Sequence, residues 1–186
     1  MLINETEFTL PNGKKAVIRS PREEDIESTL DYLRITAGET EFLLRYPEEC
    51  GKYTYEGEKA FFERANKSPN EAMILCVVED RVVGVCNIMW SQSIKLRHRA
   101  SLGIAVIKEY WGQGIATRLM EELFRVAYAN EELIQLELDF IEGNSRARAL
   151  YERLGFRITG MRPNAIRLKD GTLLNEYTMI KELKRA

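Results

Sequence analysis

Two glycines stand where an apolar stretch of this chain gives way to a helical pattern. The turn, residues 111–116, reads WGQGIA; the stretch before it ends at Ala105-Val106, and an amphipathic pattern follows it directly. The first N–H groups of a helix have no partner within the helix and carry its partial positive charge, and glycine lets a ligand approach them. The turn therefore indicates a phosphate site built from backbone amides.

The same turn admits two other interpretations. The glycines resemble the start of a dinucleotide-binding Gly-x-Gly-x-x-Gly turn, but the third glycine position is Thr117 and no acidic ribose partner follows as expected. A strand-to-helix connection without any ligand would also use glycine, to avoid steric conflict. The apolar run before the turn and the helix after it favour phosphate binding.

The elements that must position this turn follow a mixed α/β order. Ser20-Pro21 supplies an N-cap and a first-turn proline for the first helix. Glu79-Asp80-Arg81 is expected to form a tight hairpin turn, and Gly155 is expected to end a helix. The expected elements are strands at 16–19, 73–78, 82–90, 100–107, 133–140, 156–161 and 173–180, and helices at 23–35, 54–68, 145–154 and directly after the glycine turn.

Length and composition limit the class of protein. A chain of 186 residues that is 45% hydrophobic can bury one good core, so a single domain spanning residues 1–186 is expected. The net charge is −2, and Lys and Arg are spread along the chain. This distribution argues against a dedicated nucleic-acid surface.

The cysteines and the first residues bear on the compartment. Cys50, Cys76 and Cys86 have no Cys-x-x-Cys spacing and are expected to be small buried side chains in a reducing environment. The start of the chain lacks a basic region followed by an apolar one, and no window approaches the roughly 18 apolar residues of a membrane span. A cytoplasmic protein without a membrane partner is expected.

Two blocks of sequence carry a family resemblance. Gly103–Val106 with the glycine turn, and Asn144–Phe156 (NSRARALYERLGF) about forty residues further on, together resemble the GNAT superfamily of acetyl-CoA-dependent N-acetyltransferases. The resemblance implies a single-domain GNAT fold of the α/β (α+β) class. That fold has a mixed, mostly antiparallel central sheet of about seven strands flanked by about four helices, with the fourth and fifth strands splayed apart.

The resemblance also implies a site for acetyl-CoA as co-substrate, with no metal. In the family the glycine turn holds the pyrophosphate of coenzyme A, the strand before it binds the pantetheine arm, and an Asn contacts that arm. The matching positions are Ile104, Ala105, Val106, Gly112, Gln113, Gly114, Ile115, Ala116, Thr117 and Asn144. Trp111 departs from the Gln or Arg that opens the family's turn. Because the turn acts through main-chain N–H groups, the side chain at this position is expected to matter little.

Tyr151 is the predicted general acid. It stands where the family has its tyrosine, and a phenol, with a reference pKa near 10, is close enough to a thiol near 8.5 to protonate the departing thiolate. A buried ring with a hydrogen-bonded hydroxyl is the alternative interpretation of Tyr151. For Asn144 the alternative is a helix N-cap.

The general base is predicted among the carboxylates of the strand before Asn144. Ribosomal-protein alanine N-acetyltransferases, a branch of the family, have a catalytic Glu five residues before the Asn, and this position is Asp139. Its side chain is one methylene shorter, which favours a relay through water. Glu137, on the same strand face, and Glu109 are alternatives, and a solvated strand face without catalytic function is another.

The acceptor is expected to be a primary amine of a small molecule or a peptide N-terminus, attacking the donor directly in a ternary complex. In the family the acceptor side is built from segments that correspond to residues 22–68 and 161–174. These contain acidic and aromatic residues but also arginines, so the acceptor stays open. Transfer of another acyl group and a non-catalytic acyl-CoA sensor are the alternatives. The oligomeric state also stays open, with a homodimer as one alternative.

Overall fold

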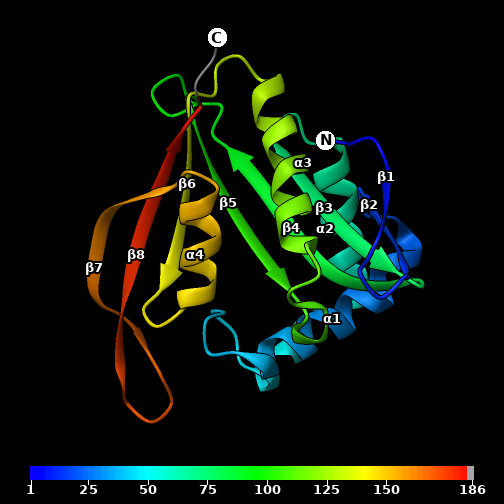
Figure 1. The fold of residues 1–186 in the computed structure, drawn as a ribbon, viewed down its shortest axis with the longest axis horizontal. Helices are drawn as coiled ribbons and strands as arrows, with labels where there is room; N and C mark the ends of the chain where they lie inside the picture. The colour runs from blue at the N-terminus through cyan, green and yellow to red at the C-terminus, as the bar shows by residue number, and fades with distance from the viewer. Residues whose placement is uncertain (184–186) are drawn as a thin grey trace. The chain divides into compact units, whose positions relative to one another are not determined.

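The computed structural model describes residues 1–183, which group into two compact units. The first unit comprises residues 1–89 and 103–129, and the second comprises residues 90–102 and 130–183. Figure 1 shows the chain with its elements labelled. A single domain over 1–186 stays a prediction, and its last three residues lie outside the described part.

The sheet of the first unit has the strand order β1-β2-β3-β4, and every neighbouring pair is antiparallel. Every residue of β3 is buried, as in a central strand covered on both faces. The strands are β1 (Thr6–Thr9), β2 (Lys15–Arg19), β3 (Glu71–Val78), β4 (Arg81–Trp90) and the last residues of β5 (Arg99–Val106).

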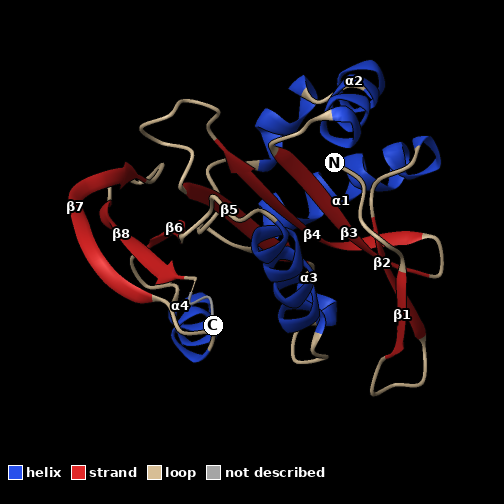
Figure 2. Ribbon diagram, turned by 90° about the horizontal axis from the view of Figure 1, so that it is seen from above, coloured by secondary structure: helices blue, strands red, loops and turns tan. Residues whose placement is uncertain are grey.

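Three long helices cover this sheet. Figure 2 shows α3 on one face of β2–β4, and α1 and α2 on the other. The helices are α1 (Ile26–Glu39), α2 (Tyr55–Lys67) and α3 (Ile115–Ala129), with short 3-10 turns η1 (Glu23–Asp25), η2 (Pro47–Lys52) and η3 (Lys108–Tyr110). The amphipathic pattern of α3 explains its docking, because its apolar stripe is buried.

Gly84 on β4 sets how closely α3 approaches the sheet. A Cβ at this position would lie 3.0 Å from Leu119 Cδ1 and 3.2 Å from Ile115 Cγ2. Both side chains are fully buried in the core. The missing side chain at position 84 therefore lets the first turns of α3 pack directly on β4.

The first helix begins differently from the sequence prediction. Ser20-Pro21 does not cap it; the Ser20 hydroxyl accepts from the Ile3 N–H. The capping carboxylate is that of Asp25, which accepts from the Arg22 N–H at 2.8 Å and forms two hydrogen bonds, of 2.6 and 2.8 Å, with Arg19. Arg19 is buried at the end of β2, and its charged guanidinium requires a carboxylate partner. The prediction failed because this requirement, met by Asp25, determines where the helix starts.

The second unit has the strand order β5-β6-β8-β7. The β5–β6 pair is parallel, and the other two pairs are antiparallel. The apolar residues of β6 are buried in alternation with the polar residues of its other face. The elements are the start of β5, then β6 (Gln135–Ile141), α4 (Ser145–Arg153), β7 (Arg157–Arg167) and β8 (Leu173–Glu182).

The mixed α/β class and the mostly antiparallel pairing are confirmed. Residues 1–183 contain eight strands rather than about seven, and the strand missed from the sequence is β1, a short edge strand. Gly155 ends α4 with a φ of 87°, as predicted. The described β5–β6 ladder covers three residue pairs, from Arg99 to Ser101, and the splay of these strands stays a prediction.

Every helix in residues 1–183 is too short or too polar to cross a membrane.

Candidate active site

The glycine turn in the first unit forms an open cradle at the start of α3. Gly112 and Gly114 have φ values of 78° and 83°, and a Cβ at either position would meet no atom within 4 Å. The bond from the Arg118 N–H to the Gly114 carbonyl, 3.2 Å long, begins the helical ladder. The N–H groups of residues 115–117 therefore precede the ladder and are available to a ligand. This geometry fits a phosphate or pyrophosphate group.

The side chains flanking the cradle fold back onto the protein. The Gln113 amide nitrogen donates to the Glu109 carbonyl at 3.3 Å, while its buried side-chain oxygen has no protein partner. The Trp111 indole N–H donates to the Val106 carbonyl at 2.7 Å. The indole is thus a polar link from the turn to β5, and the expectation that the side chain at position 111 matters little for coenzyme A binding stays a prediction.

The end of β5 is held by two elements of the first unit besides the turn. The buried hydroxyl of Tyr32, on α1, donates to the Ala105 carbonyl at 3.0 Å. The Ile107 N–H donates to the Val83 carbonyl of β4 at 2.9 Å. The predicted donor-binding strand, Ile104 to Val106, therefore has a fixed backbone. Sequence reasoning missed Tyr32, because a tyrosine within a helical pattern gives no sign of a bond to a strand.

The remaining predicted site residues lie in the second unit. Asn144 caps α4, and its side-chain oxygen accepts from the Ala147 N–H at 3.2 Å. Its capping role is therefore confirmed, and contact with coenzyme A stays a prediction for its amide nitrogen. Tyr151, seven residues on, is 6% exposed, and its ring meets Phe156 edge to face at a centroid distance of 6.0 Å.

Burial changes the acidity of the Tyr151 phenol. It raises the pKa to about 12, because the charged phenolate would be poorly solvated. The hydroxyl therefore keeps its proton throughout the physiological range. Tyr151 is a weaker acid than a free phenol, but it is always in the form that can donate.

The three candidate bases differ in the partners that their carboxylates already have within the protein. Glu137 is paired with Arg99 at 3.0 Å and accepts from the Gln135 amide at 2.7 Å. Asp139 is exposed and accepts from the Thr178 hydroxyl of β8 at 2.6 Å. Glu109, in the first unit, is paired with Arg81 at 2.9 Å. Asp139 is the one of the three without a described cation beside it, which favours it as a proton acceptor.

Several charged residues of the predicted acceptor segments are engaged within the protein. Glu39 accepts from the Lys108 N–H and Glu49 from the Tyr46 N–H, both at 2.8 Å. Arg45 donates to the Thr36 hydroxyl at 2.7 Å. These groups hold loops in place, so their charges alone do not define an acceptor.

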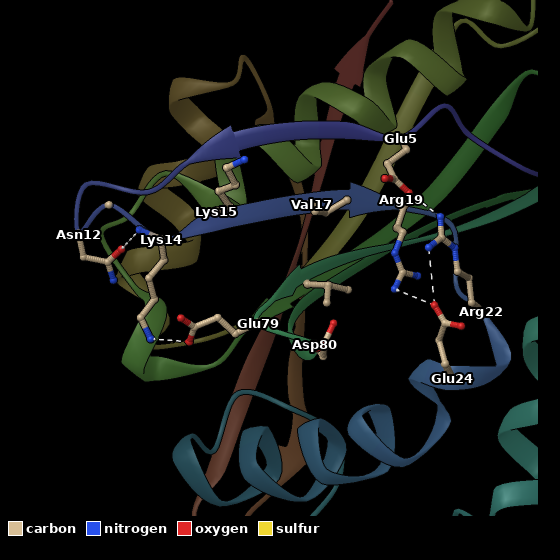
Figure 3. A pocket seen from close by; sticks show the side chains of 12 residues that line it. Glu5, Asn12, Lys14, Lys15, Val17, Arg19, Arg22, Glu24, Glu79 and Asp80 are labelled. Carbon is tan, nitrogen blue, oxygen red and sulfur yellow. Dashed lines mark hydrogen bonds and ion pairs between the residues drawn. The ribbon is translucent and has the colours of Figure 1, made fainter.

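A hollow of about 740 Å³ in the first unit involves none of the predicted site residues. Figure 3 shows it along β2, with charged side chains on its walls that pair with one another. The pairs include Lys14 with Glu79 at 2.7 Å and Arg22 with Glu5 at 2.5 Å. Because these charges neutralise one another, we assign the walls of the hollow to surface ion pairs.

Cys50, Cys76 and Cys86 are buried free thiols, as predicted. Burial raises the pKa of the Cys76 thiol to about 12, which makes it a poor nucleophile. Among residues 1–183, no three His, Cys, Asp or Glu side chains lie together in a way that would hold a metal ion.

Comparison with known proteins identifies the family. The family model for the acetyltransferase (GNAT) family matches residues 38–156, more than half of the chain. The chain belongs to this family. It is similar to an N-alpha-acetyltransferase of Saccharolobus solfataricus, at 29% identity over 153 residues, which cover 78% of this chain and 82% of the relative. This GNAT protein is thus an acetyl-CoA-dependent acyltransferase.

Solved structures agree with the fold. A GNAT-family acetyltransferase from Streptococcus pneumoniae superimposes with a TM-score of 0.84 at 27% identity, covering 90% of this chain and 99% of that one. Mycobacterium smegmatis RimJ, solved in complex with CoA-disulfide, gives a TM-score of 0.74 at 14% identity over 96% of this chain and 87% of RimJ. The second likeness concerns the fold alone.

Proposed function

We propose that this GNAT protein transfers an acetyl group from acetyl-CoA to the α-amine of a peptide by direct attack in a ternary complex. The observation that carries the proposal is the open cradle at the start of α3, where two glycines with positive φ leave the first helical N–H groups accessible. The cradle suits the pyrophosphate of coenzyme A. Bound acetyl-CoA would supply an activated acetyl thioester.

The residues of the chain then have separate tasks. The N–H groups of residues 112–117 hold the pyrophosphate, and the backbone of Ile104–Val106 binds the pantetheine arm. Tyr151 donates its proton to the sulfur as the thiolate leaves. Asp139, directly or through a water molecule, takes the proton that the attacking amine loses. Glu137 is a less favoured base because Arg99 already neutralises it.

An α-amine suits this arrangement better than an alkyl amine. The reference pKa of an α-amine is about 8, against about 10.4 for a lysine side chain, so a larger fraction is neutral near pH 7. A weak base, or one that acts through water, then suffices. The similarity to an N-alpha-acetyltransferase over most of the chain supports the same acceptor class.

The test is to incubate the protein with acetyl-CoA and a panel of amines, and to measure release of free thiol and the mass of the product. The panel holds peptides with free N-termini, the same peptides with blocked N-termini and a free lysine, polyamines and aminoglycosides. Turnover is expected with free N-termini and not with their blocked counterparts. Coenzyme A binding without turnover on any amine would instead indicate a sensor, and preference for lysine or polyamines would refute the α-amine assignment.

A further inference from the structure

The hydroxyl of Tyr32 lies between backbone groups of two strands. It donates to the Ala105 carbonyl of β5 at 3.0 Å, and the Val85 backbone of β4 lies near it. Tyr32 is 3% exposed and belongs to α1, more than seventy residues earlier in the chain than Ala105. A helix side chain thus fixes the direction of one carbonyl at the end of a strand.

The direction of that carbonyl determines the direction of the next N–H group. A trans peptide is planar, so its C=O and N–H point opposite ways, and residues 1–183 contain no cis peptide. Because the Ala105 carbonyl points toward Tyr32 and β4, the Val106 N–H points away from β4. A hydrogen bond to a peptide carbonyl also polarises the peptide and strengthens its N–H as a donor.

The next peptide, between Val106 and Ile107, is also fixed, with its N–H toward β4 and its carbonyl away from β4. Its Ile107 N–H donates to the Val83 carbonyl of β4, and its Val106 carbonyl, which points away from β4, accepts from the Trp111 indole. On the side of β5 away from β4, the carbonyl of Val106 is therefore occupied by a donor. Within residues 1–183 no hydrogen bond is described for the Val106 N–H on the same side, which leaves it to bind an acceptor atom.

We propose that Tyr32 is a positioning residue for acetyl transfer, because its hydroxyl orients and strengthens the Val106 N–H that stabilises the acetyl carbonyl oxygen. This inference rests on the proposed function. As the amine nitrogen bonds to the carbonyl carbon, the C=O π pair moves onto oxygen, where a preorganised N–H donor stabilises the developing charge. The pair then restores C=O, the C–S bond breaks, the sulfur takes a proton from Tyr151, and the amine loses its proton to Asp139.

The sequence offers a sensitive probe of this peptide. Ala-Val occurs twice in the chain, at residues 16–17 and 105–106. Labelling with carbonyl-¹³C alanine and ¹⁵N valine therefore gives two peaks in an HNCO spectrum, and the Val17 peak is an internal control. In wild-type protein, acetyl-CoA is expected to shift the Val106 amide proton further than coenzyme A does, since coenzyme A lacks the acetyl carbonyl.

The variant Tyr32→Phe keeps the ring and removes the donor. The Ala105 carbonyl carbon and Val106 nitrogen are expected to shift upfield, with Val17 unchanged and with unaltered affinity for coenzyme A. The kcat should fall roughly tenfold, less than the roughly 10²–10³-fold loss that follows deletion of an oxyanion donor. Tyr128→Phe, on the exposed side of α3, is the matched control and should leave kcat and both peaks unchanged.

The outcomes separate this inference from the proposed function. Unmoved Ala105 and Val106 signals in Tyr32→Phe, or moved signals with an unchanged kcat, overturn the positioning role. Equal responses of Val106 to acetyl-CoA and coenzyme A in the wild type also overturn it, and this arm needs no variant. If wild-type protein acetylates no amine of the panel, the proposed function fails. The comparison of the Val106 amide shifts with acetyl-CoA and with coenzyme A then still decides whether the acetyl carbonyl reaches Val106.

Discussion

Trp111 and Val106 are joined by a hydrogen bond of 2.7 Å from the indole N–H to the strand carbonyl. The bond spans five residues, from the opening residue of the cradle to the end of β5. It links the part that suits a pyrophosphate to the part that suits the pantetheine arm. Trp111, where this chain departs from the family pattern, is therefore a structural connection within the proposed donor site.

Trp111→Phe tests this connection. Removing the donor leaves the Val106 carbonyl unpaired and loosens the turn, at a cost of about 1 kcal/mol, so the KM for acetyl-CoA should rise about fivefold. Trp111→Gln, which restores the residue type of the family pattern and an N–H donor, should recover part of the loss. Steady-state kinetics with varied acetyl-CoA measures both. An unchanged KM in the Phe variant would show that the indole bond is irrelevant to donor binding.

Gly114→Ala probes the cradle itself, and Gly13→Ala is its control. Both glycines have φ near 84°, and neither has an atom within 4 Å of an added Cβ. Each substitution should lower stability by about 1–2 kcal/mol through left-handed strain alone. The Gly114 variant should also weaken coenzyme A binding, measured by calorimetry, because the new methyl obstructs the N–H groups. Equal affinities in the two variants would refute the cradle.

Tyr151→Phe should lower kcat by about 10²-fold or more while donor affinity is kept, since a general acid contributes roughly 10²–10⁴. Because burial raises the Tyr151 pKa to about 12, the hydroxyl stays protonated up to that value. In wild-type enzyme, kcat should therefore rise with pH as the amine loses its proton and show no decline from Tyr151 below about pH 11. Tyr177→Phe, whose ring stacks on Phe140, is the control. Full activity of Tyr151→Phe across the pH range would exclude the acid role.

Asp139→Asn and Glu137→Gln distinguish the two carboxylates of β6. Asp139 accepts from one hydroxyl, whereas Glu137 is neutralised by Arg99, so kcat should depend on the first. We expect Asp139→Asn to lower kcat about a hundredfold for a peptide α-amine. Glu137→Gln should change kcat less than threefold, within the effect of losing a partly exposed ion pair. The reverse order would transfer the base role to Glu137.

Asp25→Asn should destabilise the first unit strongly. The substitution leaves the Arg19 guanidinium buried without its charged partner and weakens the cap of the first helix, at a cost of about 3–5 kcal/mol. Glu24→Gln, at an exposed side chain 3.9 Å from Arg19, should cost less than about 1 kcal/mol. Urea unfolding measures both. Similar small losses would show that water reaches Arg19 and replaces Asp25.

The parts of the fold that could be read from the sequence are those with strong local signals. The cradle combines an apolar strand, two glycines and an amphipathic helix, and the polar face of β6 alternates cleanly with buried residues. Such patterns depend on residues near in sequence. The general acid and base candidates follow from the resemblance of the Asn144–Phe156 block and of the strand before it.

The features that the sequence did not reveal depend on distant partners. Ser20-Pro21 looks like a helix start, but the buried Arg19 recruits Asp25 and moves the start forward. Tyr32 looks like one more core residue of α1, and only the folded chain brings its hydroxyl to Ala105. The strand β1 is four residues long and pairs only at an edge, so its pattern is too short to detect.

The absence of a side chain at Gly84 matters for engineering this enzyme. Its bare Cα lets Ile115 and Leu119, in the first two turns of α3, pack onto β4, and the cradle is the turn that leads into that same helix. A methyl group added at position 84 would lie 3.0 Å from Leu119 Cδ1 and 3.2 Å from Ile115 Cγ2, so these side chains of α3 would have to give way by a few tenths of an ångström. A substitution in the hydrophobic core, far from any ligand atom, would thus act on the packing of the helix into which the cradle leads.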